Sequence, residues 1–421
     1  MVFQSFASAQ SFFLWSTFVI ALIMGAVVNK TNFCTMGAVS DWVNMGDTGR
    51  MRAWLFAIAI AVLGVMVLEA KGMVNVTNTF PPYRQNLFVW AENLLGGLMF
   101  GIGMTLASGC GNKSLVRLGG GNIKSLMVVL IIAIIAYFMT NPFPGSDKTL
   151  FSLLFYNWIR PLSTTLTTHQ DLGEMLFGSK RAALGRMVMG SVIGVLLLIF
   201  VFKSRDFRGS FDNILGGLIV GLAVLTAWYI TSNVMVHSDT DTIKIEKFVQ
   251  DWDLLAGPND VKPAQTGPLA PQSFTFINPM GQTLGYISHG FDKTMLTFGI
   301  MAVGGVILGS FLWSLISRRF RIEWFASFKD FLSHFFGAIL MGFGGVLGMG
   351  CTIGQGVTGF STLALGSILT FISIVFGSAL TMKIQYYKMV YENDATFFKA
   401  FITALVDLRL LPSGLRQLEA V

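Results

Sequence analysis

Nine apolar segments of membrane-spanning length run through this sequence and leave few alternatives for its fold. They cover residues 12–28, 53–69, 94–109, 123–140, 187–202, 212–231, 295–316, 335–350 and 362–382. A helix needs about 20 apolar residues to cross about 30 Å of hydrocarbon. Because 53% of the 421 residues are hydrophobic and only 12% are charged, a soluble globular protein is excluded. The sequence predicts an all-α polytopic membrane protein with about nine transmembrane helices in the lipid bilayer.

Two of these segments share a pattern of three glycines followed by a cysteine. The shared positions are Gly101, Gly103, Gly109 and Cys110 in FGIGMTLASGC, and Gly342, Gly344, Gly350 and Cys351 in MGFGGVLGMGC. Every position recurs at an offset of 241 residues. In a chain with three cysteines, this repeat predicts a duplicated membrane unit that places a thiol at the same helix break in each half.

The basic residues predict an orientation. Most of them flank the spans on one face: Lys30, Arg50, Arg52, Lys113, Arg117, Lys124, Lys203, Arg205, Arg208, Arg318, Arg319, Arg321, Lys383, Lys388 and Arg416. The positive-inside rule then places the N-terminus outside and the C-terminus in the cytoplasm, although the basic residues of 141–186 fit this less well. Because these charges lie beside spans, the net charge of +7 does not indicate a nucleic-acid partner.

With nine spans, the two halves would be inverted pseudo-repeats. We expect a first membrane repeat over residues 1–140, an outer connection with a linking span over 141–210, and a second repeat over 211–382. The second repeat includes an outer loop at 232–294, and a cytoplasmic tail follows at 383–421. Inverted repeats are typical of transporters that bind substrate near the bilayer midplane.

The glycine-cysteine segments are expected to break within the membrane. Residues 94–107 form only about 21 Å of helix, which is too short to cross. Irregular backbone at that depth must face protein or a water-filled path, so the short half-helices predict a re-entrant, pore-lining arrangement. Close helix packing is the alternative role for the glycines, and simple burial is the alternative for the cysteines.

The chain resembles the YeeE/YedE family of bacterial sulphur-compound transporters, whose best understood members take up thiosulfate. The resemblance covers most of the chain and rests on NKTNFCTMGAVSDW at 29–42, GIGMTLASGCGNKSLVRLGGG at 101–121 and GFGGVLGMGCTIGQGVTG at 342–359. It implies an hourglass-like pore in a bacterial inner membrane and three functional thiols, at Cys34, Cys110 and Cys351. It also implies passage of substrate by transient hydrogen bonds, without covalent capture or large conformational change, and a cytosolic sulphur-carrier partner of the TusA type.

Thiosulfate has a hard trioxo end and a soft terminal sulfur. Backbone N–H groups at glycine turns and helix N-termini suit the oxo end, whereas a neutral S–H is a weak donor that permits release. The candidate substrate-binding residues are Cys34, Cys110, Cys351, Gly109, Gly111, Gly350, Thr352, Gln355, Asn112 and Lys113. Helix capping and membrane anchoring are the alternative roles for the polar members of this set.

A membrane thiol oxidoreductase, or the membrane anchor of a sulphur-metabolising enzyme, is the alternative function. It would require two thiols, such as Cys110 and Cys351, to approach disulfide geometry. The sequence has no Cys-x-x-Cys, Rossmann or P-loop motif, and the four histidines have no metal-binding spacing. We therefore expect a transporter without enzymatic activity, cofactor or metal.

Cys34 has no partner cysteine in the second half, where its counterpart is expected near residues 228–237. In the long outer loop, TFINPMG at 275–281 is apolar enough to dock back onto the body. We hypothesise that it partly covers the outer mouth, and a plain surface loop is the alternative.

Overall fold

The computed structural model describes residues 1–237, 242–252, 267–392 and 394–419. Within this part, nine helices are long and apolar enough to cross a membrane. They contain α1 (Phe6–Thr31), α3 (Gly49–Ala70), α4 (Trp90–Leu106), α6 (Ile123–Thr140), α10 (Ala182–Phe202), α12 (Phe211–Asn233), α16 (Phe298–Ile316), α17 (Phe328–Leu347) and α18 (Leu365–Val390). The span that contains α4 extends over Trp90–Gly119 and includes the short helix that follows it. The predicted all-α polytopic class is confirmed, and the nine apolar segments of the sequence each fall on one of these helices.

Several short elements complete the chain. Four of them belong to the membrane core: α2 (Thr35–Ser40), its π-helical extension Asp41–Met45, α5 (Gly111–Gly119) and α15 (Ile277–Ser288). A fifth core element is the helical stretch at 352–361, most of which is the π-helical turn Gly354–Gly359. The remaining helices are α7 (Leu150–Leu154), α8 (Tyr156–Ile159), α9 (Leu172–Phe177), α11 (Arg205–Gly209), α13 (Ile245–Gln250) and α19 (Phe397–Asp407).

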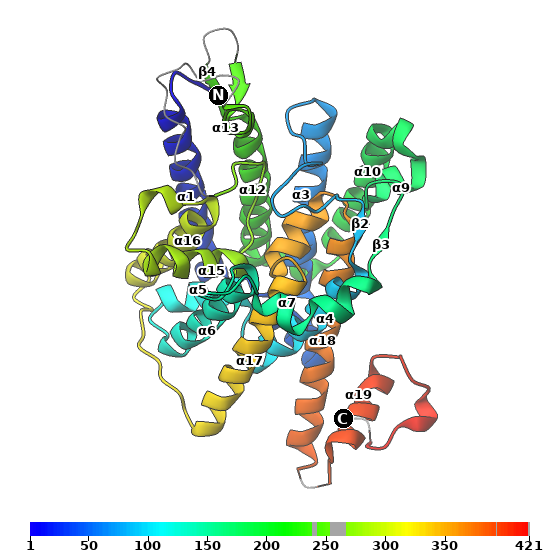
Figure 1. The fold of residues 1–421 in the computed structure, drawn as a ribbon. Coiled ribbons are helices and arrows are strands. Elements are labelled where there is room, and N and C mark those ends of the chain that lie inside the picture. The colour runs from blue at the N-terminus through cyan, green and yellow to red at the C-terminus, as the bar shows by residue number, and fades with distance from the viewer. Residues whose placement is uncertain (238–241, 253–266, 393, 420–421) are drawn as a thin grey trace.

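Sheet structure is minimal in the described residues. β1 (Val2–Phe3) pairs in parallel with β4 (Met235–His237), which pairs antiparallel with β5 (Thr242–Lys244). A separate antiparallel pair joins β2 (Leu87–Phe88) to β3 (Thr164–Thr165). The first of these sheets holds the N-terminus against the end of α12, and the C-terminus lies at the opposite end of the bundle (Figure 1).

Long helices from one half of the chain pack against long helices from the other half. α1 packs along α16, whereas α12 packs along α3. Likewise α4 packs against α18, whereas α17 packs against α6, and α4 and α17 cross each other in the middle of the molecule (Figure 1). The order of long, short, long, broken and long helix over 6–140 also recurs over 211–390. These pairings agree with the expected duplication, while the inverted repeat and the hourglass pore stay predictions.

Glycines bring the backbones of α4 and α17 into direct contact. A Cβ placed on Gly344 would lie 2.5 Å from the backbone nitrogen of Phe100, and one on Gly103 would lie 2.6 Å from the carbonyl oxygen of Gly337. Real Cβ atoms do not approach other atoms so closely, and only glycine permits this crossing. Close packing, the alternative that the sequence left open for these glycines, is therefore one of their roles.

Candidate functional site

Each of the three cysteines begins a short helix. Cys34 and Cys110 are the N-cap residues of α2 and α5. Their carbonyl oxygens accept the first helical hydrogen bonds, from Ala38 at 3.0 Å and Ser114 at 2.9 Å. The Cys351 carbonyl does the same for Gln355 at 2.8 Å. All three thiols therefore lie at helix breaks, where N-terminal N–H groups remain without intrahelical partners.

The three helix breaks share one backbone conformation. The residue two positions before each cysteine has a left-handed conformation, with φ of 51° at Asn32, 56° at Ser108 and 55° at Met349. This conformation costs about 1–2 kcal/mol for a residue other than glycine. It ends the preceding long helix, and two residues later the next helix begins at the cysteine. The chain thus turns sharply at the same distance from each thiol.

The sulfur atoms form a connected set. The thiols of Cys34 and Cys110 interact directly, and Cys110 is also close enough to Cys351 for an electrostatic interaction. The Gly354 N–H donates to Cys351 Sγ at 3.4 Å, and the Gly37 backbone lies close to the Cys34 thiol. Three buried thiols from three separate motifs of the sequence are therefore brought together.

Buried polar atoms without hydrogen-bond partners gather around these thiols. Within the described part of the chain they include Thr35 Oγ1, Asn112 Oδ1, Thr275 Oγ1, Thr352 Oγ1 and Gln355 Oε1. Four of them belong to residues within four positions of a cysteine, and the Thr352 hydroxyl lies beside the Cys110 thiol. A buried polar atom left unpaired costs about 1–3 kcal/mol. Such a concentration indicates a place where a polar ligand or water completes the hydrogen bonding.

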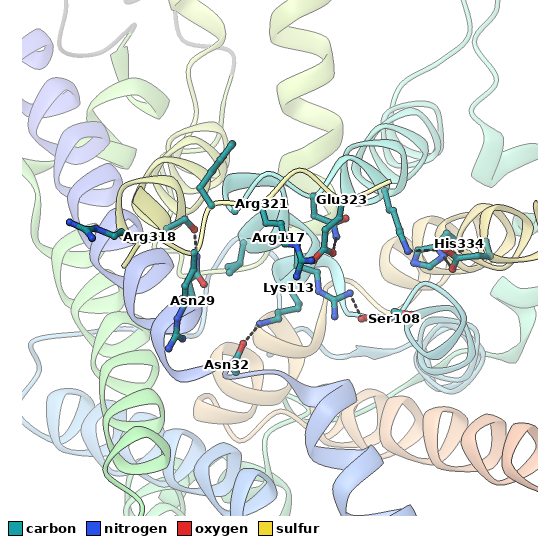
Figure 2. Close-up of a pocket in the computed structure, with 17 residues that line it drawn as sticks. Asn29, Asn32, Ser108, Lys113, Arg117, Arg318, Arg321, Glu323 and His334 are labelled. Atoms are coloured by element: carbon teal, nitrogen blue, oxygen red, sulfur yellow. Dashed lines mark hydrogen bonds and ion pairs between the residues drawn. The ribbon is translucent and has the colours of Figure 1, made fainter. Parts of the chain in front are cut away.

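Two basic cavities lead toward Cys34. The larger, of 790 Å³, is lined by basic and acidic residues that include Lys113, Arg117, Lys124, Arg318, Arg319, Arg321, Glu323 and Asp330 (Figure 2). The smaller, of 550 Å³, is lined by Cys34 and Arg50. Asn32, Lys113 and Arg117 line both cavities. The two cavities therefore meet at a wall that contains two cations.

These two cations have only uncharged partners. Lys113 Nζ donates to Asn32 Oδ1 at 3.2 Å, and Arg117 Nη1 donates to the Ser108 carbonyl oxygen at 2.6 Å (Figure 2). In the part of the chain that the structure describes, neither forms an ion pair with a carboxylate. Arg50 differs, because Asp41 pairs with it through both carboxylate oxygens. The positive charge next to Cys34 thus comes from Lys113 and Arg117.

The predicted glycines allow neighbouring segments to approach the thiols. A Cβ on Gly111 would lie 2.7 Å from Ile277 Cδ1, and one on Gly350 would lie 3.1 Å from Thr275 Oγ1. At Gly109 the nearest atom would be Lys113 Cγ, at 3.3 Å. The candidate residues from the three sequence motifs therefore lie around the same buried region.

The segment that precedes α15 enters this region, and the sequence only partly revealed it. The docking of TFINPMG is confirmed, because Ile277 and Met280 are buried. Near 228–237, where the counterpart of Cys34 is expected, α12 ends at Asn233 and strand β4 follows it in place of a short helix. The segment at 273–276, which the short helix α15 follows, occupies the position expected of the Cys34 counterpart. Thr275 follows Cys34 by the repeat offset of 241 residues, a signal that was available in the sequence.

Comparison with known proteins identifies the family of this chain. The family model described as sulphur transport matches residues 30–380, which contain all three cysteines. The chain belongs to the sulphur transport family. Membership in the sulphur transport family confirms the resemblance to YeeE/YedE proteins that the three motifs indicated.

Two relatives within the sulphur transport family are thiosulfate transporters by name. The thiosulfate transporter TsuA of Escherichia coli (strain K12) is 23% identical over 356 residues, which cover 80% of this chain and 84% of the relative. The thiosulfate transporter TsuA of Spirochaeta thermophila is 22% identical over 378 residues, covering 87% of this chain and 97% of the relative. This member of the sulphur transport family thus spans most of the length of both.

Proposed function

We propose that this protein takes up thiosulfate, or a related sulphur-containing anion, across a bacterial inner membrane. The family assignment and the two relatives named thiosulfate transporters support this substrate class. In the proposed orientation the N-terminus is outside and the basic cavities open to the cytoplasm. The substrate then passes from Cys351 to Cys110 and on to Cys34.

The observation that carries the proposal is the meeting of three cysteine-capped helix N-termini. Free N–H groups and the partial positive charge of a helix N-terminus suit the oxo end of the anion. A neutral thiol donates weakly to the soft terminal sulfur. Because each contact is shallow, the anion is bound well enough to enter and weakly enough to leave.

Lys113 and Arg117 provide the electrostatic part of the path. A dianion loses hydration when it enters the membrane, and nearby cations offset that loss. Because the two residues have no carboxylate partner among the described residues, their charge is available to the anion. We further propose that the larger basic cavity receives the substrate on the cytoplasmic side, where a TusA-type carrier would accept its sulphur.

Uptake of labelled thiosulfate tests the proposal in a bacterial strain that lacks its own sulfate and thiosulfate importers. We expect wild type to transport, and Cys34→Ala, Cys110→Ala and Cys351→Ala each to abolish uptake at equal membrane expression. Cys→Ser variants are the matched set, because they keep the size and a hydrogen-bond donor but remove the soft sulfur. Wild type that expresses but moves no thiosulfate would contradict the substrate, and uptake that ignores the cysteines would contradict the path.

The contact between Cys34 and Cys110 also favours a second candidate, a thiol oxidoreductase. Its minimum requirement is a disulfide that forms and opens reversibly between these neighbours. Thiol titration of the purified, denatured protein distinguishes the two functions. Three free thiols after mild oxidation support the transporter, and one free thiol with restored titration after reduction supports the oxidoreductase.

A further inference from the structure

Residues 273–276 form a further break at the centre of the molecule. Phe274 and Phe276 are fully buried, and the Phe274 carbonyl oxygen accepts a hydrogen bond from Thr358 Oγ1 at 2.7 Å. Ser273 Oγ donates to the Val224 carbonyl oxygen at 2.9 Å. The segment is therefore tied to α12 on one side and to the helical stretch after Cys351 on the other, and it holds Thr275 in a fixed position.

The Thr275 side chain packs against the first helical turn that follows Cys351. A Cβ on Gly354 would lie 2.5 Å from Thr275 Oγ1, and one on Gly350 would lie 3.1 Å from the same atom. The backbone of Phe276, next in the chain, lies close to the Cys351 thiol. The Thr275 hydroxyl and the Cys351 sulfur thus lie at the same turn, and glycine at positions 350 and 354 permits this close approach.

The Thr275 hydroxyl has no partner there. Thr275 is only 8% exposed, and its Oγ1 makes no hydrogen bond within the described residues. Buried threonines inside the long helices can satisfy their hydroxyls within their own helix, as Thr17 does with the Phe13 carbonyl oxygen and Thr370 with that of Gly366, both at 2.8 Å. Thr275 precedes its helix, so no such carbonyl is within reach.

We propose that Thr275 is a substrate-binding residue that donates its hydroxyl hydrogen to an oxo oxygen of the anion at Cys351. This inference rests on the proposed function and assigns the oxo end of the substrate to a named group. Thr352 directly follows Cys351 in the sequence. Its hydroxyl, which also has no partner among the described residues, supplies a second donor. Thr275 stands where the repeat offset places the equivalent of Cys34, so the hydroxyl replaces a thiol at the outer end of the path.

The test compares Thr275→Val with Thr275→Ser and with the control Thr17→Val. Valine keeps the shape of threonine and removes the hydroxyl, and serine keeps the hydroxyl. KM and maximal rate of thiosulfate uptake are measured at equal expression, together with thermal melting of the purified proteins with and without thiosulfate. A hydrogen bond to a charged group contributes enough that its loss should raise KM about tenfold or more.

We expect Thr275→Val to raise KM and to reduce the melting shift given by thiosulfate, with Thr275→Ser and Thr17→Val near wild type. The melting temperature without thiosulfate should not fall in Thr275→Val, because the hydroxyl lacks a partner to lose. An active wild type with an unchanged Thr275→Val overturns this inference alone. A wild type that neither transports thiosulfate nor is stabilised by it overturns the proposed function and the inference with it.

Discussion

Lys113 donates a hydrogen bond to the Asn32 side-chain oxygen at 3.2 Å while being only 7% exposed. A buried ammonium group usually has a carboxylate partner. In the chain as described, the partner of Lys113 is a neutral amide that lines both basic cavities with it. We therefore expect an arriving anion to balance the charge of Lys113.

We expect Lys113→Met to lower thiosulfate uptake at least about tenfold, because one hydrogen bond to a charged group is lost. The matched control is Lys124→Met, since Lys124 lines the same cavity but is paired with Asp330 at 2.8 Å. Initial rates over a range of thiosulfate concentrations give the KM of each variant. Equal losses in both variants would show that general cavity charge, and not the unpaired Lys113, attracts the anion.

The packing of α16 on α1 depends on Gly309. A Cβ there would lie 1.9 Å from the Leu22 carbonyl oxygen, so Gly309→Ala forces the helices apart and should destabilise the protein by about 3 kcal/mol. Gly304→Ala on the same helix is the control, because its Cβ would meet only Phe18 Cε2, at an ordinary 3.7 Å. Thermal melting in detergent measures both. A similar small effect at the two positions would refute the close approach.

The buried Arg84 and the partly exposed Glu69 form an ion pair with two hydrogen bonds, of 2.6 and 2.9 Å. Arg84→Met leaves the Glu69 carboxylate without its partner and should destabilise the protein by about 3 kcal/mol. The double variant Arg84→Met, Glu69→Leu removes both charges and should recover most of that loss. A double-mutant cycle on chemical denaturation measures the coupling, and additive losses would argue against it.

The tail helix α19 should undock in acid. Burial raises the pKa of the Asp407 carboxyl, but the hydrogen bond from Tyr387 and the charges of Arg416 and Lys383 outweigh it and hold the pKa below the ordinary value. A lowered folded-state pKa gives stability that is present above the ordinary value, near about 4, and is lost as pH falls through the folded value.

Hydrogen exchange of the α19 amides between pH 7 and pH 3, corrected for the intrinsic pH dependence, measures this undocking. Asp407→Asn should show at pH 7 the protection that wild type shows in acid. If protection in wild type stays constant down to pH 3, Asp407 does not hold the tail.

The spans were predictable from the sequence because a membrane helix depends on a long apolar segment, which hydropathy detects directly. The site was predictable in part. The repeated motif placed Cys110 and Cys351 at breaks, whereas the contact between Cys34 and Cys110 depends on how α1 ends at Asn32, and no local pattern encodes that distance. The resemblance, and not the spacing, placed Cys34 among the functional residues.

The interpretation of the sequence missed the role of the 273–276 segment, and the reason is a different one. A long insertion follows α12, so the chain distance between α12 and α15 differs from that between α1 and α2. Counting from the end of the helix therefore placed the Cys34 counterpart too early, near 228–237. The hypothesis that 275–281 covers the outer mouth remains a prediction, and part of the linker before it, at 253–266, lies outside the described residues. Counting the 241-residue repeat offset from Cys34 leads instead to Thr275, which the tertiary packing returns to the thiols.

The glycine crossing of α4 and α17 has a kinetic consequence. Backbones in direct contact cannot slide past each other without breaking many close contacts at once. The two helices should therefore keep their relative position during each transport cycle. In the proposed transport path, side-chain rotations would then open the way past the thiols. We therefore expect a shallow Arrhenius slope for thiosulfate flux in liposomes, closer to that of a channel than to that of a rocking carrier.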